Sequence, residues 1–222
     1  DSRVQKHSFS VTPIFIWKPD LNFKNSDYAV ITKWQVNFIN TGEFTVEMNN
    51  RLTYLFNEFD PTATEGAIPL PGDNAYKYTD FNVSYRSDQR KTFSYRIQPS
   101  VGTFFNGKKY SIASNLAWRI QPNFSGSIQI NYDKINLPQP FSDASIWLVG
   151  PKIDLTFNKS LFWSTFIQYS SQQENFGVNT RLQWRFAPLS DLFIVYNDNY
   201  YSNNFAPRFK SLNLKLTYWL NI

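Results

Sequence analysis

Apolar and polar residues alternate one by one over runs of about ten positions along most of this chain. In the clearest run, 176–186, the even positions carry Phe, Val, Thr, Leu and Trp, whereas the odd positions carry mainly Asn, Arg and Gln. Successive side chains of a β-strand point to opposite faces, so this period predicts a strand with one apolar and one polar face. The same alternation occurs in four other runs, 93–101, 110–120, 124–132 and 212–222.

Weaker alternating runs raise the expected number of strands to twelve. Helix signals are almost absent, and the longest apolar run, 192–196, is far shorter than the roughly 20 residues that a transmembrane helix needs. Pro13 and Pro99 fall inside two of the runs, where proline is tolerated at a strand start, an edge or a bulge. The weaker runs are 7–17, 27–39, 44–57, 77–87, 144–157, 160–170 and 191–199.

The links between the expected strands alternate in length. Short links that alternate with long ones, between strands of alternating polarity, are typical of a bacterial outer-membrane β-barrel. An even number of strands then places both termini on the short-link side, which is periplasmic in such barrels. The expected tight links are 40–43, 87–90, 121–123, 158–160 and 188–191, and the longer ones are 18–26, 58–76, 106–109, 134–143, 171–175 and 199–208.

The alternation alone fits two architectures. In a soluble sandwich the apolar face of each strand forms the core, whereas in a membrane barrel that face meets lipid. Inside a membrane every backbone polar group must be paired internally, so a membrane sheet must close on itself. Tyrosine and tryptophan end many of the apolar faces, as the interfacial girdles of a barrel require, which favours the membrane barrel.

The two faces of such a barrel have separate sets of candidate residues. Basic residues outnumber acidic ones on the polar face, so its lumen should favour anionic or polyhydroxyl solutes. The residues expected to face lipid are Phe93, Tyr95, Ile97, Ile128, Ile130, Leu182, Trp184, Leu214, Leu216 and Tyr218. The residues expected to line the lumen are Lys33, Arg51, Arg86, Arg96, Arg119, Lys152, Asp154, Arg181, Arg185 and Lys215.

The composition narrows the chemistry. The chain has 222 residues, 18% of them aromatic, a formal net charge of +5, no cysteine and one histidine. Without cysteine there is neither a disulfide framework nor a cysteine-ligated metal site, and one histidine excludes most histidine metal sites and Ser-His-Asp catalysis. We expect no catalytic residue, no metal and no cofactor. His7 itself is expected to be an exposed residue before the first strand.

One loop and one set of basic residues leave more than one interpretation open. Four carboxylates in the loop 58–76 are either oxygen ligands for Ca²⁺ or solvated loop charges. Four basic lumen residues either bind phosphate or carboxylate groups or form an ion-pair network with acidic residues. The loop carboxylates are Glu58, Asp60, Glu65 and Asp73; the basic residues are Arg119, Arg181, Arg185 and Lys215; their acidic partners would be Glu47, Asp80, Asp133 and Asp154.

Aromatic residues of the expected loops are candidates for stacking on sugar rings, for rim positions or for contact with a partner protein. Nucleic-acid binding is not expected, because the basic residues are spread one per strand instead of forming a patch. Gly102 and Gly107 are isolated, so there is no glycine-rich phosphate loop. The loop aromatics are Phe104, Phe105, Tyr200, Tyr201 and Phe205.

Several stretches of the chain carry a family resemblance. They read VNTRLQWRF at 178–186 with Pro188, SDLFIVYN at 190–197, LKLTYWL at 214–220, GAIPLPGD at 66–73, and QYSS at 168–171 before Asn175. Together they resemble the C-terminal β-barrel of an uncharacterised bacterial outer-membrane family, over about residues 45–222. Members of that family look like an N-terminal family-nine-type carbohydrate-binding domain joined to a large barrel. The resemblance implies that such a domain and earlier strands precede this chain, whose end at Ile222 departs from the aromatic residue common at barrel ends.

These observations predict one domain, 1–222, an all-β antiparallel transmembrane barrel of about twelve strands in the outer membrane of a Gram-negative bacterium. Its expected work is non-enzymatic: it anchors a carbohydrate-binding-like module or forms a subunit of a larger outer-membrane complex. Expected partners are outer-membrane lipid, other outer-membrane proteins or lipoproteins, and a glycan, but not nucleic acid. The alternatives are a channel for anionic or carbohydrate solutes, and a hydrolase in which Asp133 and Asp154 meet in the lumen.

Overall fold

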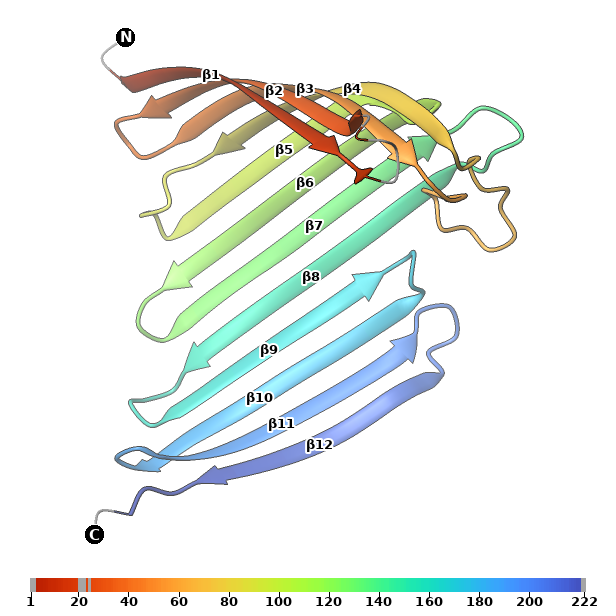
Figure 1. Ribbon diagram of the computed structural model, residues 1–222. Coiled ribbons are helices and arrows are strands. Elements are labelled where there is room, and N and C mark those ends of the chain that lie inside the picture. Colours follow the sequence, from red (N-terminus) through yellow and green to blue (C-terminus); the bar gives the residue numbers. More distant parts are fainter. Residues whose placement is uncertain (1–2, 20–22, 24, 221–222) are drawn as a thin grey trace. The chain divides into compact units, whose positions relative to one another are not determined.

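The fold is a single antiparallel sheet of twelve strands. The computed structural model describes residues 3–19, 23 and 25–220. Each strand is hydrogen-bonded to the strands before and after it in sequence, in the order β1 to β12 (Figure 1). The prediction of an all-β chain with twelve antiparallel strands is therefore confirmed. The strands are β1 (Val4–Trp17), β2 (Asn25–Phe38), β3 (Glu43–Leu55), β4 (Asn74–Arg86), β5 (Phe93–Phe104), β6 (Gly107–Ile120), β7 (Phe124–Asn136), β8 (Ala144–Thr156), β9 (Leu161–Ser170), β10 (Asn175–Ala187), β11 (Ser190–Tyr201) and β12 (Pro207–Thr217).

Two details of the predicted elements are wrong. The link expected at 106–109 does not exist, because β5 and β6 are joined by Phe105 and Asn106 alone. Lys109 was predicted to lie in a loop, but it belongs to β6, where successive side chains alternate between the two faces. His7 lies within β1 and not before it, because the polar start of that strand pairs with β2, where His7 lies opposite Val36. His7 is exposed as expected, and its ring stacks on that of Trp34 with 6.0 Å between centroids.

The chain divides into two compact units, which are described separately. The first unit contains β1 to β4 and the second contains β9 to β12, and residues of β5 to β8 are shared between them. The first unit comprises 1–89, 96–114 and 131–146, and the second comprises 90–95, 115–130 and 147–222.

In the first unit the strand register gathers polar and apolar residues on opposite faces. One row of directly paired residues crosses five strands and is polar throughout: Ser10, Lys33, Glu47, Asn82 and Ser100. The neighbouring row is apolar: Phe9, Trp34, Val46 and Val83. We call the face that carries each row the polar face and the apolar face of this unit.

The second unit repeats this arrangement. An apolar row runs through Leu155, Trp163, Leu182, Ile194 and Leu214, one residue from each of β8 to β12. The row beside it contains Asp154, Ser164, Arg181, Val195 and Asn213. The polar face of this unit is the one that carries Arg181.

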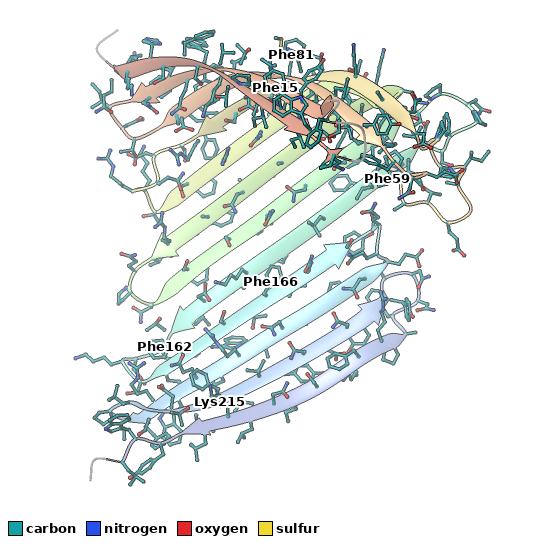
Figure 2. The ribbon with its side chains drawn as sticks, viewed as in Figure 1. Phe15, Phe59, Phe81, Phe162, Phe166 and Lys215 are labelled. Carbon is teal, nitrogen blue, oxygen red and sulfur yellow. The ribbon has the colours of Figure 1, made fainter. Side chains whose placement is uncertain are left out.

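The apolar faces have no protein layer over them within the described ranges. On β12, Leu212, Leu214 and Leu216 are 70%, 68% and 62% exposed, and in the first unit Phe15 and Phe81 are exposed as well (Figure 2). A soluble sandwich would bury such residues between two sheets. No described segment forms a helix of the length and apolarity needed to cross a membrane. The buried apolar residues are few: Val36, Leu70, Tyr76, Ile135 and Leu137.

Candidate functional site

A pocket of about 320 Å³ lies on the polar face of the first unit, over β3 to β6. Most of its lining side chains come from alternate residues, which share one face of neighbouring strands, whereas β5 contributes the consecutive residues 100–104. Glu47 and Arg51 come from β3, Asp80 and Asn82 from β4, and Ser100 from β5. The pocket therefore follows directly from the polar rows of the sheet.

Asp80 is the most heavily bonded carboxylate of this pocket. Its Oδ2 atom accepts hydrogen bonds from the side-chain amides of Asn49 and Asn82, both at 2.8 Å. The Nε atom of Arg51 lies 3.7 Å from its Oδ1 atom. The amide of Asn49 also donates to Glu47 at 3.1 Å. One cation and two amides thus offset the charge of Asp80.

The lysine on the other side of the pocket is also neutralised. The Nζ atom of Lys109 lies 3.0 Å from the Oδ2 atom of Asp133 and 5.3 Å from the ring centroid of Phe104. In the part of the chain that the structure describes, the side chains of Gln98 and Ser100 make no hydrogen bond to protein. The pocket consequently combines paired charges with unoccupied neutral donors and acceptors.

Aromatic rings close one end of the pocket and hold a loop there. Phe104 and Tyr78 line the pocket and contact each other edge to face, with 6.0 Å between centroids. Phe105 packs on Tyr78 at 5.6 Å and on Phe59 of the loop 56–73 at 5.8 Å. Phe59 and the fully buried Leu70 exchange two backbone hydrogen bonds of 3.1 and 2.8 Å. The loop is therefore fastened to the aromatic end of the polar face.

The carboxylates of this loop do not gather into a metal site. In residues 3–19, 23 and 25–220, no three His, Cys, Asp or Glu residues are placed to hold a metal ion. Asp60 instead accepts hydrogen bonds from Thr62 Oγ1 at 2.6 Å and from the backbone N–H groups of Thr62 and Thr64, each at 2.9 Å. Burial raises the pKa of Asp60, but these bonds outweigh it and hold the pKa below its ordinary value of 3.8. The loop carboxylates Glu58, Asp60, Glu65 and Asp73 are therefore not gathered around one point in the described structure, and Asp60 is bonded within its own loop.

The predicted lumen residues lie on the polar faces, and the structure separates them into paired and unpaired charges. Arg86 lies 2.9 Å from Glu43, Lys152 lies 3.0 Å from Asp154, and Arg185 lies 3.4 Å from Asp191. Arg119 lies ten residues after Lys109 on β6, and this even spacing places both on the same face of the strand. Within the described chain no side-chain partner is found for the remaining four, Lys33, Arg96, Arg181 and Lys215.

Of the four basic residues with two interpretations, Arg185 pairs with Asp191, which was not among the expected acidic partners, and Arg181 and Lys215 have no side-chain partner in the described chain. The expected partners Asp80, Asp133 and Asp154 pair instead with Arg51, Lys109 and Lys152. Asp133 and Asp154, the candidate hydrolase acids, are each ion-paired with a lysine of their own unit.

The residues predicted to face lipid belong to the apolar rows. Leu182 and Leu214 stand in one row, and Trp184 and Leu216 stand in the next. Ile97 pairs with Tyr85, and Phe93 and Tyr95 share its side of β5. Tyr218 follows β12, and its ring stacks on Phe186 with 6.4 Å between centroids. Ile128 and Ile130 occupy alternate positions of β7.

The loop aromatics do not form one group. Phe104 lines the pocket, and Phe105 is the turn residue beside it. In the second unit, the ring of Tyr201 lies 4.5 Å from the Arg208 guanidinium, and Phe205 packs on Phe176. Tyr200 belongs to the cluster described next.

A charged cluster on the apolar face of the second unit was not predicted from the sequence. Asp198 is 3% exposed, and its Oδ2 atom accepts hydrogen bonds of 2.5 Å from the hydroxyls of Tyr196 and Tyr200. Lys210, which pairs with Asp198 across β11 and β12, places Nζ 3.5 Å from the same oxygen. Tyr196, Asp198 and Tyr200 follow Leu192 and Ile194 at every second position. The alternation along β11 therefore already placed these three residues on the same face of the strand.

Phenylalanine on the polar face of the second unit was also missed. Phe162 pairs with Gln183, which pairs with Phe193, which pairs with Lys215. Phe166 pairs with Asn179 on the same face (Figure 2). This polar face is therefore more mixed than that of the first unit.

A scan against protein-family models, a search of the curated proteins and a search of the solved structures each found no match. The function must consequently be inferred from the two kinds of face, the pocket and the side-chain clusters described above.

Proposed function

We propose that this chain is a non-enzymatic β-sheet protein of the Gram-negative outer membrane, with its apolar faces toward acyl chains and its polar faces toward water. The observation that carries the proposal is the uncovered apolar face. Rows such as Leu155, Trp163, Leu182, Ile194 and Leu214 continue from strand to strand without a second protein layer in the described residues. Contiguous apolar patches of this kind mark a surface that meets a membrane or another protein.

Strand length and aromatic placement agree with a membrane. A tilted strand of about 9–11 residues spans a bilayer, and the strands here contain 10 to 14 residues. Aromatic rings gather near strand ends, with Trp184 against Phe186 at 5.7 Å and Phe93 against Trp118 at 4.9 Å. Rings at such positions anchor a barrel in the headgroup region.

The biological role in this proposal is that of an anchor or a subunit. Twelve strands return the chain to the side where it started, so both termini would face the periplasm. In line with the family resemblance, the sheet would hold a carbohydrate-binding-like module at the membrane and contact other outer-membrane proteins or lipoproteins. Partner contacts would use the edge strands β1 and β12 or the loops.

A channel is the second candidate, and the pocket on the polar face favours it. Conductance across a planar lipid bilayer distinguishes the two roles: purified protein that inserts without carrying current supports the anchor, whereas stepwise current supports the channel.

The absence of cysteine makes the membrane proposal directly testable. Arg181→Cys and Leu182→Cys place one thiol on each face of β10 at adjacent positions. Each variant is labelled with a fluorescent maleimide and refolded into vesicles whose phospholipids carry bromine on their acyl chains. We expect the bromine to quench the probe at 182 strongly and the probe at 181 weakly, and aqueous iodide to do the reverse.

Tryptophan background is removed by exciting the maleimide dye alone, and refolding in unbrominated vesicles provides the reference intensity. Equal quenching of both probes, or stronger acyl-chain quenching at 181, contradicts the proposed orientation.

A further inference from the structure

We propose that the pocket on the polar face of the first unit binds a neutral polyhydroxylated solute, such as a short saccharide. The pocket lies within one compact unit and is lined mainly by polar-face residues, together with the ring of Phe104 and with Val101 and Thr103 of β5. This inference goes beyond the proposed membrane role and does not depend on what covers the apolar face.

The charge arrangement favours a neutral ligand. Arg51 lies 3.7 Å from Asp80, and Lys109 lies 3.0 Å from Asp133, so each pocket cation already has a carboxylate partner. An anion would have to displace such a partner and leave a carboxylate without its cation. The cations without a side-chain partner in the described chain, Lys33 and Arg96 of the first unit and Arg181 and Lys215 of the second, do not line the pocket. The pocket therefore offers an anion no unpaired cation.

The hydrogen-bonding groups fit hydroxyls. Gln98, Ser100 and Ser111 line the pocket, and in the described part of the chain their side chains have no protein partner. A serine hydroxyl and a glutamine amide each offer both a donor and an acceptor. A sugar hydroxyl also donates and accepts, so neighbouring hydroxyls of one ring can satisfy several of these groups together.

The aromatic end of the pocket supplies the apolar contact that a sugar ring needs. Phe104 is held at an interplanar angle of 73° to Tyr78 and of 78° to Phe105. A ring fixed in this way presents a surface against which the C–H groups of a pyranose can pack. The volume of about 320 Å³ lies at the lower end of the range of small-molecule sites. About one or two sugar rings fill that volume, so further rings of an oligosaccharide would extend out of the pocket.

Isothermal titration calorimetry on the purified, refolded chain tests this assignment. The neutral probes are maltotriose, cellotriose and chitotriose, and the anionic probes are citrate and glucose 6-phosphate. We expect at least one trisaccharide to bind and both anions to bind more weakly. Binding of an anion in preference to every trisaccharide, or no binding of any probe, overturns the proposal.

Two substitutions locate the site. Ser100→Trp fills the pocket, whereas Ser10→Trp changes the same residue type on the same polar row at β1, outside the pocket. We expect the first to abolish trisaccharide binding and the second to preserve it. Phe104→Leu keeps an apolar side chain, removes the ring, and should weaken binding by about two- to tenfold. It remains informative if Ser100→Trp fails to fold, and unchanged affinity in the folded variants overturns the assignment.

Discussion

Asp80 and Asp198 have partners of the same number and kind, but they lie on opposite kinds of face, one polar and one apolar. Each carboxylate accepts hydrogen bonds from two neutral side chains and faces one cation: two asparagines and Arg51 for Asp80, two tyrosines and Lys210 for Asp198. Asp80 belongs to a polar face and borders an open pocket, and its side chain is 21% exposed. Asp198 belongs to an apolar face, and its side chain is 5% exposed.

The difference between the two carboxylates shows that the face of the sheet determines how much each charge depends on its hydrogen-bond and ion-pair partners. Water can replace a lost partner of Asp80, because the pocket is open to solvent. Asp198 is almost fully buried beside Tyr196, Tyr200 and Lys210, and its Oδ1 atom is buried without a hydrogen bond. A charge in such surroundings persists only when it is paired. On this apolar face the carboxylate of Asp198 thus has all its donors and its cation at one oxygen, Oδ2, while the other oxygen has none.

The strongest way to break this comparison is to place an uncovered charge on the apolar face. Leu212→Arg does so at the centre of β12, on the Leu-rich side of that strand. In the membrane proposal it should reduce the free energy of unfolding by about 2–4 kcal/mol, the cost of arginine near the bilayer midplane. Urea titration of the protein in vesicles measures the change.

Asn213→Arg provides the matched control, because residue 213 lies on the polar face of the same strand. We expect it to alter stability little. A similar loss in both variants contradicts the assignment of the faces.

The next test removes the cation from each carboxylate. Lys210→Met and Arg51→Met keep an apolar side chain of comparable reach and remove the charge. We expect Lys210→Met to lower the midpoint of thermal unfolding more, because Asp198 keeps two tyrosine bonds but has no access to water. Lys210→Arg should restore most of the midpoint. If Arg51→Met lowers the midpoint of thermal unfolding more than Lys210→Met does, the surroundings of a carboxylate do not determine how much it depends on its cation.

A smaller effect is expected from the amides around Asp80. Asn49 is almost fully buried, and its amide links Asp80 to Glu47, whereas Asn82 is half-buried. Asn49→Leu should lower the free energy of unfolding by about 1 kcal/mol. The substitution removes two hydrogen bonds to carboxylates, but it also removes the buried Asn49 Oδ1 atom, which has no partner. Asn82→Leu should cost less, because water can take the place of its amide. Urea unfolding of the two variants, compared with the parent chain, gives both values, and equal losses would argue against the role of burial.

The smallest expected effect concerns Asp60 and acid pH. Its folded pKa lies below 3.8, so its hydrogen bonds contribute stability above that pH and lose it as the pH falls through the folded pKa. The aromatic cluster of Phe59, Phe105 and Tyr78 should therefore lose near-ultraviolet circular dichroism on acidification. In Asp60→Asn this pH-dependent step should be absent. A step of equal size in both proteins would assign the change to other carboxylates.

The strands were predictable because nearly every one of them is a simple alternating run with a partner on each side. The run 176–186 corresponds to β10, and 124–132 lies inside β7. His7 and Lys109 were misplaced because polar residues at strand ends resemble loop residues when only one strand is considered. Their positions depend on the neighbouring strand, which supplies the hydrogen bonds.

The candidate site was predictable only in part. The polar rows identified Arg51 and Asp80, but not that β3 to β6 enclose a pocket around them. In β9, apolar residues occupy both faces, so only its pairing with β10 shows that Phe162 and Phe166 share the polar face. The contact between Asp198 and Lys210 likewise depends on a register between two strands that the sequence does not contain.

Phe105 combines two tasks in one residue. Its φ of 51° lies in the left-handed region, which glycine or asparagine adopts more easily. Its ring, however, contacts Phe59, Tyr76 and Tyr78 and thereby secures the loop 56–73. Natural variants that carry glycine at this hairpin would gain backbone freedom and lose the attachment of the loop together. Among relatives, we therefore expect glycine here to co-occur with a shortened loop or with a new aromatic residue inside it.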